Sequence, residues 1–134
     1  MQLCEKWSLE FNDRMPIYRQ VVLQFSRAFV RGDIQLGERI PSIRDLSVLL
    51  KVNTNTVQRA YQEMERDSLI TSRRGTGYFI TEERTKMEDT RKSLVHDSLR
   101  RFLEDMRAIG CSNKDILDEL KNYMKGDEIL EHAS

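Results

Sequence analysis

The chain has 134 residues, which is room for one full domain and a small appendage. A 39% apolar fraction supports an ordinary core and 33% charged residues favour a soluble, helix-rich protein, while no apolar run approaches the roughly 20 residues that a membrane span needs. The net charge of zero conceals an asymmetry: residues 1–81 hold 12 basic and 9 acidic side chains, net +3, and residues 82–134 hold 10 and 13, net −3.

The first segment, residues 1–14, has no helical period. Its Trp7, Leu9 and Phe11 alternate as an extended arm against the core would. Acidic and basic residues interrupt any signal-peptide core here, and Cys4 and Cys111 match neither a disulfide nor a metal spacing. We therefore expect a cytoplasmic protein with two reduced thiols.

The first helical pattern follows Pro16, a residue that suits the first turn of a helix. The apolar residues that recur at helical spacing are Ile17, Val21, Phe25, Ala28 and Phe29. Gly32 is expected to end this helix near residue 31. Gly37 and Pro41 then bracket residues 38–40, which are long enough for one short strand.

Two short helical patterns come next, around a tight turn. Ser42 stands three residues before Asp45, a capping-box-like start for a helix. Its expected inward residues are Ile43, Leu46, Leu49 and Leu50. Lys51 and Val52 form the turn, and Asn53 is a good N-cap for the second helix. That helix has one apolar stripe, made of Val57, Ala60, Tyr61 and Met64.

The face opposite this stripe is polar. It carries Asn55, Arg59, Gln62 and Arg66, with Thr54, Thr56 and Gln58 on its shoulders. Hydrogen-bonding side chains at a helix start favour contact with base edges of DNA over the alternative, an ordinary solvated surface. Residues 39–74 hold seven basic and four acidic side chains, a modest excess that favours DNA only slightly.

A hairpin pattern follows directly. Residues 69–72 and 78–81 are predicted strands, joined by the turn Arg73-Arg74-Gly75-Thr76-Gly77. The glycines allow positive φ and a close backbone approach, and the arginines can contact phosphates or a minor groove. The alternative is an ordinary hairpin without a role in DNA binding. Because the predicted hairpin directly follows the helix pair, a DNA-contacting wing is favoured.

From about Glu82 the pattern becomes that of a long amphipathic helix, which Gly110 should end. Its apolar positions are Val95, Leu99, Phe102, Leu103, Met106 and Ile109. Ser112 and Asp115 open a second helix, followed by Gly126. The apolar residues of this helix are Ile116, Leu117, Leu120, Tyr123 and Met124. Two such helices cannot bury both apolar faces alone, so they must pack on the first domain or on another copy of the chain.

Four motifs together resemble the DNA-binding domain of GntR-family bacterial transcription regulators. They are Pro-Ile-Tyr (16–18), Gly-Glu-Arg-Ile-Pro-Ser (37–42), Asn-Thr-Asn-Thr-Val-Gln-Arg-Ala-Tyr (53–61) and the turn at 73–77. The resemblance covers about residues 15–81. It implies a mainly α fold with a small β-wing, that is, a winged helix-turn-helix domain at 1–81. The remaining residues, 82–134, are similar to the short two-helix dimerisation tail of the family's YtrA branch.

The resemblance also implies which residues touch DNA. Arg44 would contact phosphate or base, residues 53–59 would enter the major groove, and the tip at 73–76 would reach the minor groove. Some branches carry arginine where this chain has Thr54 and Gln58, which gives the other recognition positions more weight. The predicted DNA-binding residues are Arg44, Asn53, Thr54, Asn55, Thr56, Gln58, Arg59, Arg73, Arg74, Gly75 and Thr76. The predicted homodimer interface comprises Val95, Leu99, Phe102, Leu103, Met106, Leu117 and Leu120.

No catalytic residue, cofactor or metal is predicted. His96 and His132 have acidic neighbours, but neither stands at a metal-ligand spacing from a cysteine. The sequence has no P-loop pattern and no paired nucleophile and base. It also lacks the long aminotransferase-like extension of another GntR branch. We therefore expect no enzyme.

Two functions fit these patterns. The first is a sequence-specific repressor that binds double-stranded DNA as a homodimer on an inverted-repeat operator, and the YtrA resemblance suggests control of neighbouring transporter genes. The second is a winged-helix module that binds another protein. Arg73, Arg74 and the polar helix face favour the first. Whether a small-molecule effector binds is left open by the sequence.

Overall fold

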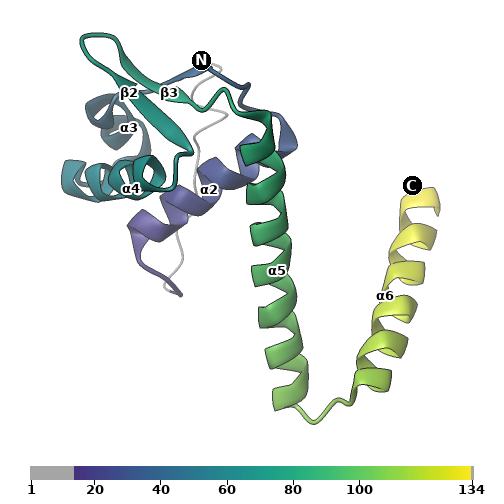
Figure 1. The fold of residues 1–134 in the computed structure, drawn as a ribbon. Helices are drawn as coiled ribbons and strands as arrows, with labels where there is room; N and C mark the ends of the chain where they lie inside the picture. Colours follow the sequence, from purple (N-terminus) through teal and green to yellow (C-terminus); the bar gives the residue numbers. More distant parts are fainter. Residues whose placement is uncertain (1–13, 134) are drawn as a thin grey trace. The chain divides into compact units, whose positions relative to one another are not determined.

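The computed structural model of the chain describes residues 14–133, with side chains described as far as Asp127 (Figure 1). The arm expected from Trp7, Leu9 and Phe11 lies outside the described residues, as does Cys4. The chain divides into two compact units after Ser93. The boundary expected after residue 81 remains a prediction about which part of the chain binds DNA.

The first helix, α2 (Ile17–Arg31), follows an extended Pro16 and ends at Gly32, whose φ of 83° is left-handed. The buried side chains along it include Val21, Phe25, Ala28 and Phe29, as the sequence predicts. Ile17 is 42% exposed, contrary to expectation. The buried stripe enters the first turn through Tyr18 instead, because Tyr18 is the residue three before Val21 and its side chain packs on the core.

The helix-turn-helix is confirmed as α3 (Ile43–Leu50) and α4 (Thr54–Arg66). Lys51 makes the turn with a φ of 56°. The side chain of Ser42 accepts a hydrogen bond from the backbone N–H of Asp45 at 3.0 Å and so caps α3.

One expectation for α3 is wrong: Leu49 is 36% exposed rather than inward. The inward face of α3 follows the spacing i, i+3, i+4, i+7. It consists of Ile43, Leu46, Ser47 and Leu50. Ser47 can be buried because its hydroxyl donates to the Arg44 carbonyl at 2.7 Å, and Leu49 is thereby turned aside.

A three-stranded antiparallel sheet completes the first unit, in the order β1-β3-β2. The strands are β1 (Arg39–Ile40), β2 (Ile70–Arg73) and β3 (Gly77–Ile80), within one residue of the predicted wing strands. Gly77 closes the hairpin with a φ of 127°, and an added Cβ there would stand 3.3 Å from Nε of Arg39. The positive φ favours glycine at this first residue of β3, since L side chains rarely adopt that conformation.

The core of this unit surrounds the inner face of α4. Its fully buried Tyr61 donates to the Pro41 carbonyl at 2.6 Å and meets the rings of Phe25 and Tyr78 edge-on. Burial raises the pKa of Tyr61, so the hydroxyl keeps its proton and its hydrogen bond. The α4 helix packs on α2, α3 and the sheet through this inner face. The opposite, outer face of α4 is therefore exposed to solvent.

The second unit contains the end of α5 (Arg84–Ala108) and α6 (Asn113–Ala133), joined at Gly110. The α6 helix begins with a capping box in which Ser112 Oγ accepts from the Asp115 N–H and Asp115 accepts from the Ser112 N–H, which lowers the Asp115 pKa. The helix continues through Gly126 and does not end before it, since a single glycine costs a long helix only about 1 kcal/mol. None of the helices in the described part of the chain is long and apolar enough to cross a membrane.

Candidate nucleic-acid interface

The outer face of α4 is exposed, as its sequence pattern predicts. Asn55, Gln58 and Arg59 are exposed there, Thr54 is exposed at the helix start, and Thr56 is half-buried. The opposite face is held rigidly, because Val57, Ala60, Tyr61 and Met64 are each no more than 1% exposed. A helix fixed through one face and polar on the other can present hydrogen-bonding groups to a DNA groove.

The start of α4 is shaped by Asn53. Its side-chain Oδ1 accepts a hydrogen bond from the backbone N–H of Asn55 at 2.8 Å. The carbonyl oxygen of the side chain is thus used for capping, whereas the two N–H donors of this exposed amide take no part in the cap. Asn53 therefore combines a structural role with donors that suit a phosphate or base acceptor.

Asn53→Ala is expected to lower the free energy of unfolding by about 1 kcal/mol, because the cap of α4 is lost. Chemical denaturation measures this change. Asn53→Asp is the matched control, since it keeps the capping oxygen and should retain nearly the original stability. Equal stability of the alanine variant and the unmodified protein would contradict the capping role.

Arg59 has a neighbour that the sequence did not predict. The central carbon of its guanidinium lies 3.9 Å from the centroid of the Tyr18 ring, which comes from the first turn of α2. This is a close cation–π contact. It connects the outer face of α4 to the helix that begins with the Pro-Ile-Tyr motif, a motif that sequence reasoning used only as a family marker.

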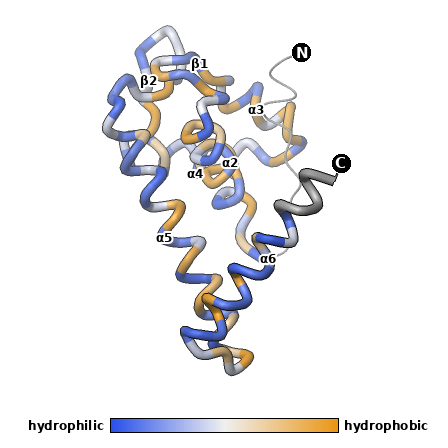
Figure 2. The backbone as a smooth tube through the Cα atoms, turned by 90° about the vertical axis from the view of Figure 1, so that its right-hand side faces the viewer, coloured by the Kyte–Doolittle hydropathy of each residue, from blue (hydrophilic) through white to orange (hydrophobic). Residues whose placement is uncertain are grey.

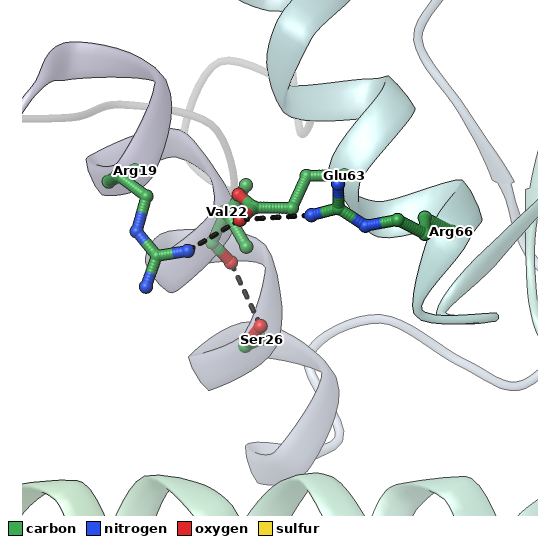
Figure 3. A network of polar contacts seen from close by, with 5 residues as sticks. All are labelled: Arg19, Val22, Ser26, Glu63 and Arg66. Atoms are coloured by element: carbon green, nitrogen blue, oxygen red, sulfur yellow. Dashed lines mark hydrogen bonds and ion pairs between the residues drawn. The ribbon is translucent and has the colours of Figure 1, made fainter.

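A second contact joins the same two helices. Arg19 Nη1 lies 2.6 Å from Glu63 Oε1, and Arg66 Nη2 lies 3.5 Å from the same oxygen (Figure 3). The Glu63 side chain is only 13% exposed, whereas both arginines point largely into solvent. Glu63 therefore neutralises part of the positive charge near the end of α4 and ties that helix to α2.

The wing arginines differ from each other. Arg73 is the last residue of β2, and its guanidinium lies over the Phe79 ring, 4.3 Å from the centroid, with Nη2 3.3 Å from Glu82 Oε1. The side chain of Arg73 is therefore folded back along the hairpin, away from the turn. Arg74 belongs to the exposed turn between β2 and β3, which is closed by the Thr76 N–H donating to the Arg73 carbonyl at 2.9 Å. Glu82 was not recognised from the sequence as a partner of the wing.

Arg44 occupies the first turn of α3, with an exposed side chain. The predicted contact residues thus come from α3, α4 and the wing, three elements that share one core. His96 is exposed, and among the described residues no three histidine, cysteine or acidic side chains gather as metal ligands would. His132 is outside the described side chains.

These elements define the class of winged-helix proteins: a helix-turn-helix with a polar outward face, followed by a β2–β3 wing in a three-stranded sheet. Residues 17–80 match the gntR family of bacterial regulatory proteins. The chain is also 33% identical to the HTH-type regulator YhcF of Bacillus subtilis, over 87% of this chain and 97% of that protein. It is 30% identical to the HTH-type transcriptional repressor YtrA of the same organism, over 82% of each.

A solved structure agrees with these relatives. A GntR family transcriptional regulator from Listeria monocytogenes is 32% identical, with a TM-score of 0.76 over 84% of this chain and 98% of that one. The chain belongs to the gntR family, and is a DNA-binding transcription regulator rather than an enzyme. This membership decides between the two functions considered from the sequence and favours DNA over a protein-binding module.

Proposed function

We propose that this regulator is a cytoplasmic repressor that binds an inverted-repeat operator as a homodimer and controls neighbouring transporter genes. The observation that carries the proposal is the exposed polar face of α4, which stands on a buried inner face and beside an arginine-bearing wing. The similarity to YtrA, a repressor by name, supports the direction of regulation.

Selection of bound duplexes from a random pool tests this proposal, followed by a gel shift on the promoter next to the protein's own reading frame. We expect an enriched inverted repeat that also occurs in that promoter. Enrichment of a single, unrepeated site would contradict the dimeric operator, and higher expression of the neighbouring genes when the protein is present would contradict repression.

Sequence reading is assigned to Asn55, Thr56 and Arg59, with Arg44 and Gln58 assisting. Side chains in the first turns of a recognition helix reach base edges in the major groove. Thr54 and the amide of Asn53 lie at the helix start, where backbone N–H groups and the helix dipole favour a phosphate. We therefore assign positioning to the N-cap and first residue of α4, and base reading to the residues that follow in its first turns.

The wing is assigned to phosphates or the adjacent minor groove, through Arg73, Arg74, Gly75 and Thr76. Replacing both Arg73 and Arg74 with alanine should weaken binding to operator and random DNA alike. The slope of log affinity against log salt concentration should decrease in magnitude by about 1 to 2. Each lost phosphate contact reduces the magnitude of this slope by roughly 0.9.

Titrations at several salt concentrations measure this effect. Arg74→Ala alone should account for most of the change, because Arg73 is paired with Glu82. Arg31→Ala is the charge-matched control for Arg74→Ala, since it removes an exposed arginine at the end of α2, where it is paired with Asp33. Unchanged affinity and slope in the double variant would show that the wing does not touch DNA.

Dimerisation is assigned to the tail. The α5 helix has 25 residues, a length of about 37 Å, and none of its side chains is buried. Apolar positions recur along both tail helices between hydrophilic ones (Figure 2). Phe102, Leu103 and Met106 are half-buried, and the more exposed apolar residues of the proposed interface are Val95, Leu99, Leu117 and Leu120.

A second copy of the chain would cover these apolar residues, since exposed apolar side chains at helical spacing gain free energy when removed from water. Two copies related by a two-fold axis would also present two recognition helices to successive major grooves, about 34–36 Å apart or a multiple of it. This geometry requires an inverted repeat in the operator.

A further inference from the structure

We propose that Tyr18 is a positioning residue for DNA recognition, because its ring holds the Arg59 guanidinium in place before DNA binds. The inference rests on the proposed role of Arg59 in reading DNA. It adds a residue from α2, a helix outside the helix-turn-helix, to the machinery of recognition.

The Tyr18 ring is itself well fixed. Tyr18 lies in the first turn of α2, after Pro16, whose own ring restricts the backbone where the chain enters the helix. The side chain is partly buried and packs on the core of the first unit. Its ring is therefore a rigid platform, and Arg59 is the long, flexible partner that the contact orders.

The contact is reinforced one residue further along α2. Arg19 pairs with Glu63 at 2.6 Å, and Glu63 stands one helical turn after Arg59 on α4 (Figure 3). The first turn of α2 therefore meets α4 at two successive turns. The two contacts together restrain the position of the Tyr18 ring relative to Arg59.

Stacking leaves the useful part of Arg59 free. A guanidinium that lies over a ring uses its planar face, while its N–H donors point outward from its edge. Within the described part of the chain, no hydrogen bond or ion pair is found that engages these donors of Arg59. The edge can then form a two-pronged contact with guanine or with a phosphate.

Preordering explains why such a platform would help binding. An arginine that is free in solution loses rotamer entropy when it is fixed against DNA, and this loss opposes association. If Tyr18 has already fixed the Arg59 side chain in the free protein, this entropy is lost when the protein folds and no longer opposes DNA binding. Removing the ring should then weaken binding even though Tyr18 need not touch DNA.

A double-mutant cycle on the full chain tests this, with a duplex selected from a random pool by the unmodified protein. Tyr18→Leu should weaken binding about two- to fivefold, the range expected for an exposed cation–π contact. In an Arg59→Ala background the same change should have no effect. Tyr18→Phe keeps the ring and should bind as tightly as the unmodified protein.

Three results would overturn the proposal. Equal losses from Tyr18→Leu in both backgrounds would make the ring a purely structural part of the core. Tighter binding by Tyr18→Leu would mean that the ring holds Arg59 away from DNA. A loss in Tyr18→Phe as large as in Tyr18→Leu would assign the effect to the hydroxyl. Failure to select any duplex would instead reject the proposed DNA-reading function.

A second measurement needs no change at Tyr18. In nitrogen-15 NMR of the full chain, the Arg59 Nε–Hε signal, assigned with Arg59→Lys, should be shifted upfield by the ring current of Tyr18. The shift should be present before DNA is added. A signal at the position of a free arginine would contradict the preordered contact.

Discussion

Phe102→Asp is expected to convert the protein to a monomer and to weaken operator binding by about 10²–10⁴-fold. The aspartate would place an unpaired charge among the apolar side chains of the proposed interface, which is strongly unfavourable. In a dimer, binding of one half of the operator holds the second recognition helix close to the other half, which raises the overall affinity. A monomer binds each half separately and loses this increase, so the expected loss of affinity is large. Light scattering and titration of the operator measure the two effects.

Ala108→Asp is the matched control for this change. Ala108 is exposed, is the last residue of α5, and lies on the side of the helix away from Phe102 and Leu99. The variant should remain dimeric and keep nearly full affinity. Because Phe102 and Ala108 both belong to the second unit, the first unit should stay folded in both variants. An intact protein that is monomeric at micromolar concentration, yet binds its operator normally, would contradict the model of the tail as a dimer interface.

Arg59→Ala is expected to lower operator affinity by about 10- to 100-fold while leaving nonspecific binding at low salt almost unchanged. A good two-pronged contact between arginine and guanine contributes roughly 1–3 kcal/mol of discrimination. Random DNA lacks the matched base, so little is lost there. Competition titrations with operator and random duplexes measure the two affinities in parallel.

Arg27→Ala provides the control for charge alone. Arg27 is exposed on the side of α2 opposite Tyr18, and it carries the same charge as Arg59. Its removal should change neither specificity nor, beyond a small electrostatic effect, affinity. If Arg59→Ala reduces binding to operator and random DNA by the same factor, Arg59 contacts phosphate and the reading of bases belongs to Asn55 and Thr56.

The sequence alone determined the elements of the first unit and the orientation of α4. Asn53 and Ser42 cap their helices as predicted, because capping depends on a side chain and backbone N–H groups only two or three residues away. The buried stripe of α4 follows from its period of 3.6 residues. An exposed polar face opposite this stripe was therefore predictable before the fold was known.

Only the tertiary structure decided what the exposed and half-buried side chains touch. Tyr18 meets Arg59, and Arg19 meets Glu63 across 44 residues of chain, because α2 packs on α4 at one particular angle and position. A local period shows which face of a helix is buried but not which residue of another helix stands beside it. For the same reason, the sequence did not predict the pairing of Arg73 with Glu82. It also did not predict that Ser47, rather than Leu49, is buried where α3 packs on the core.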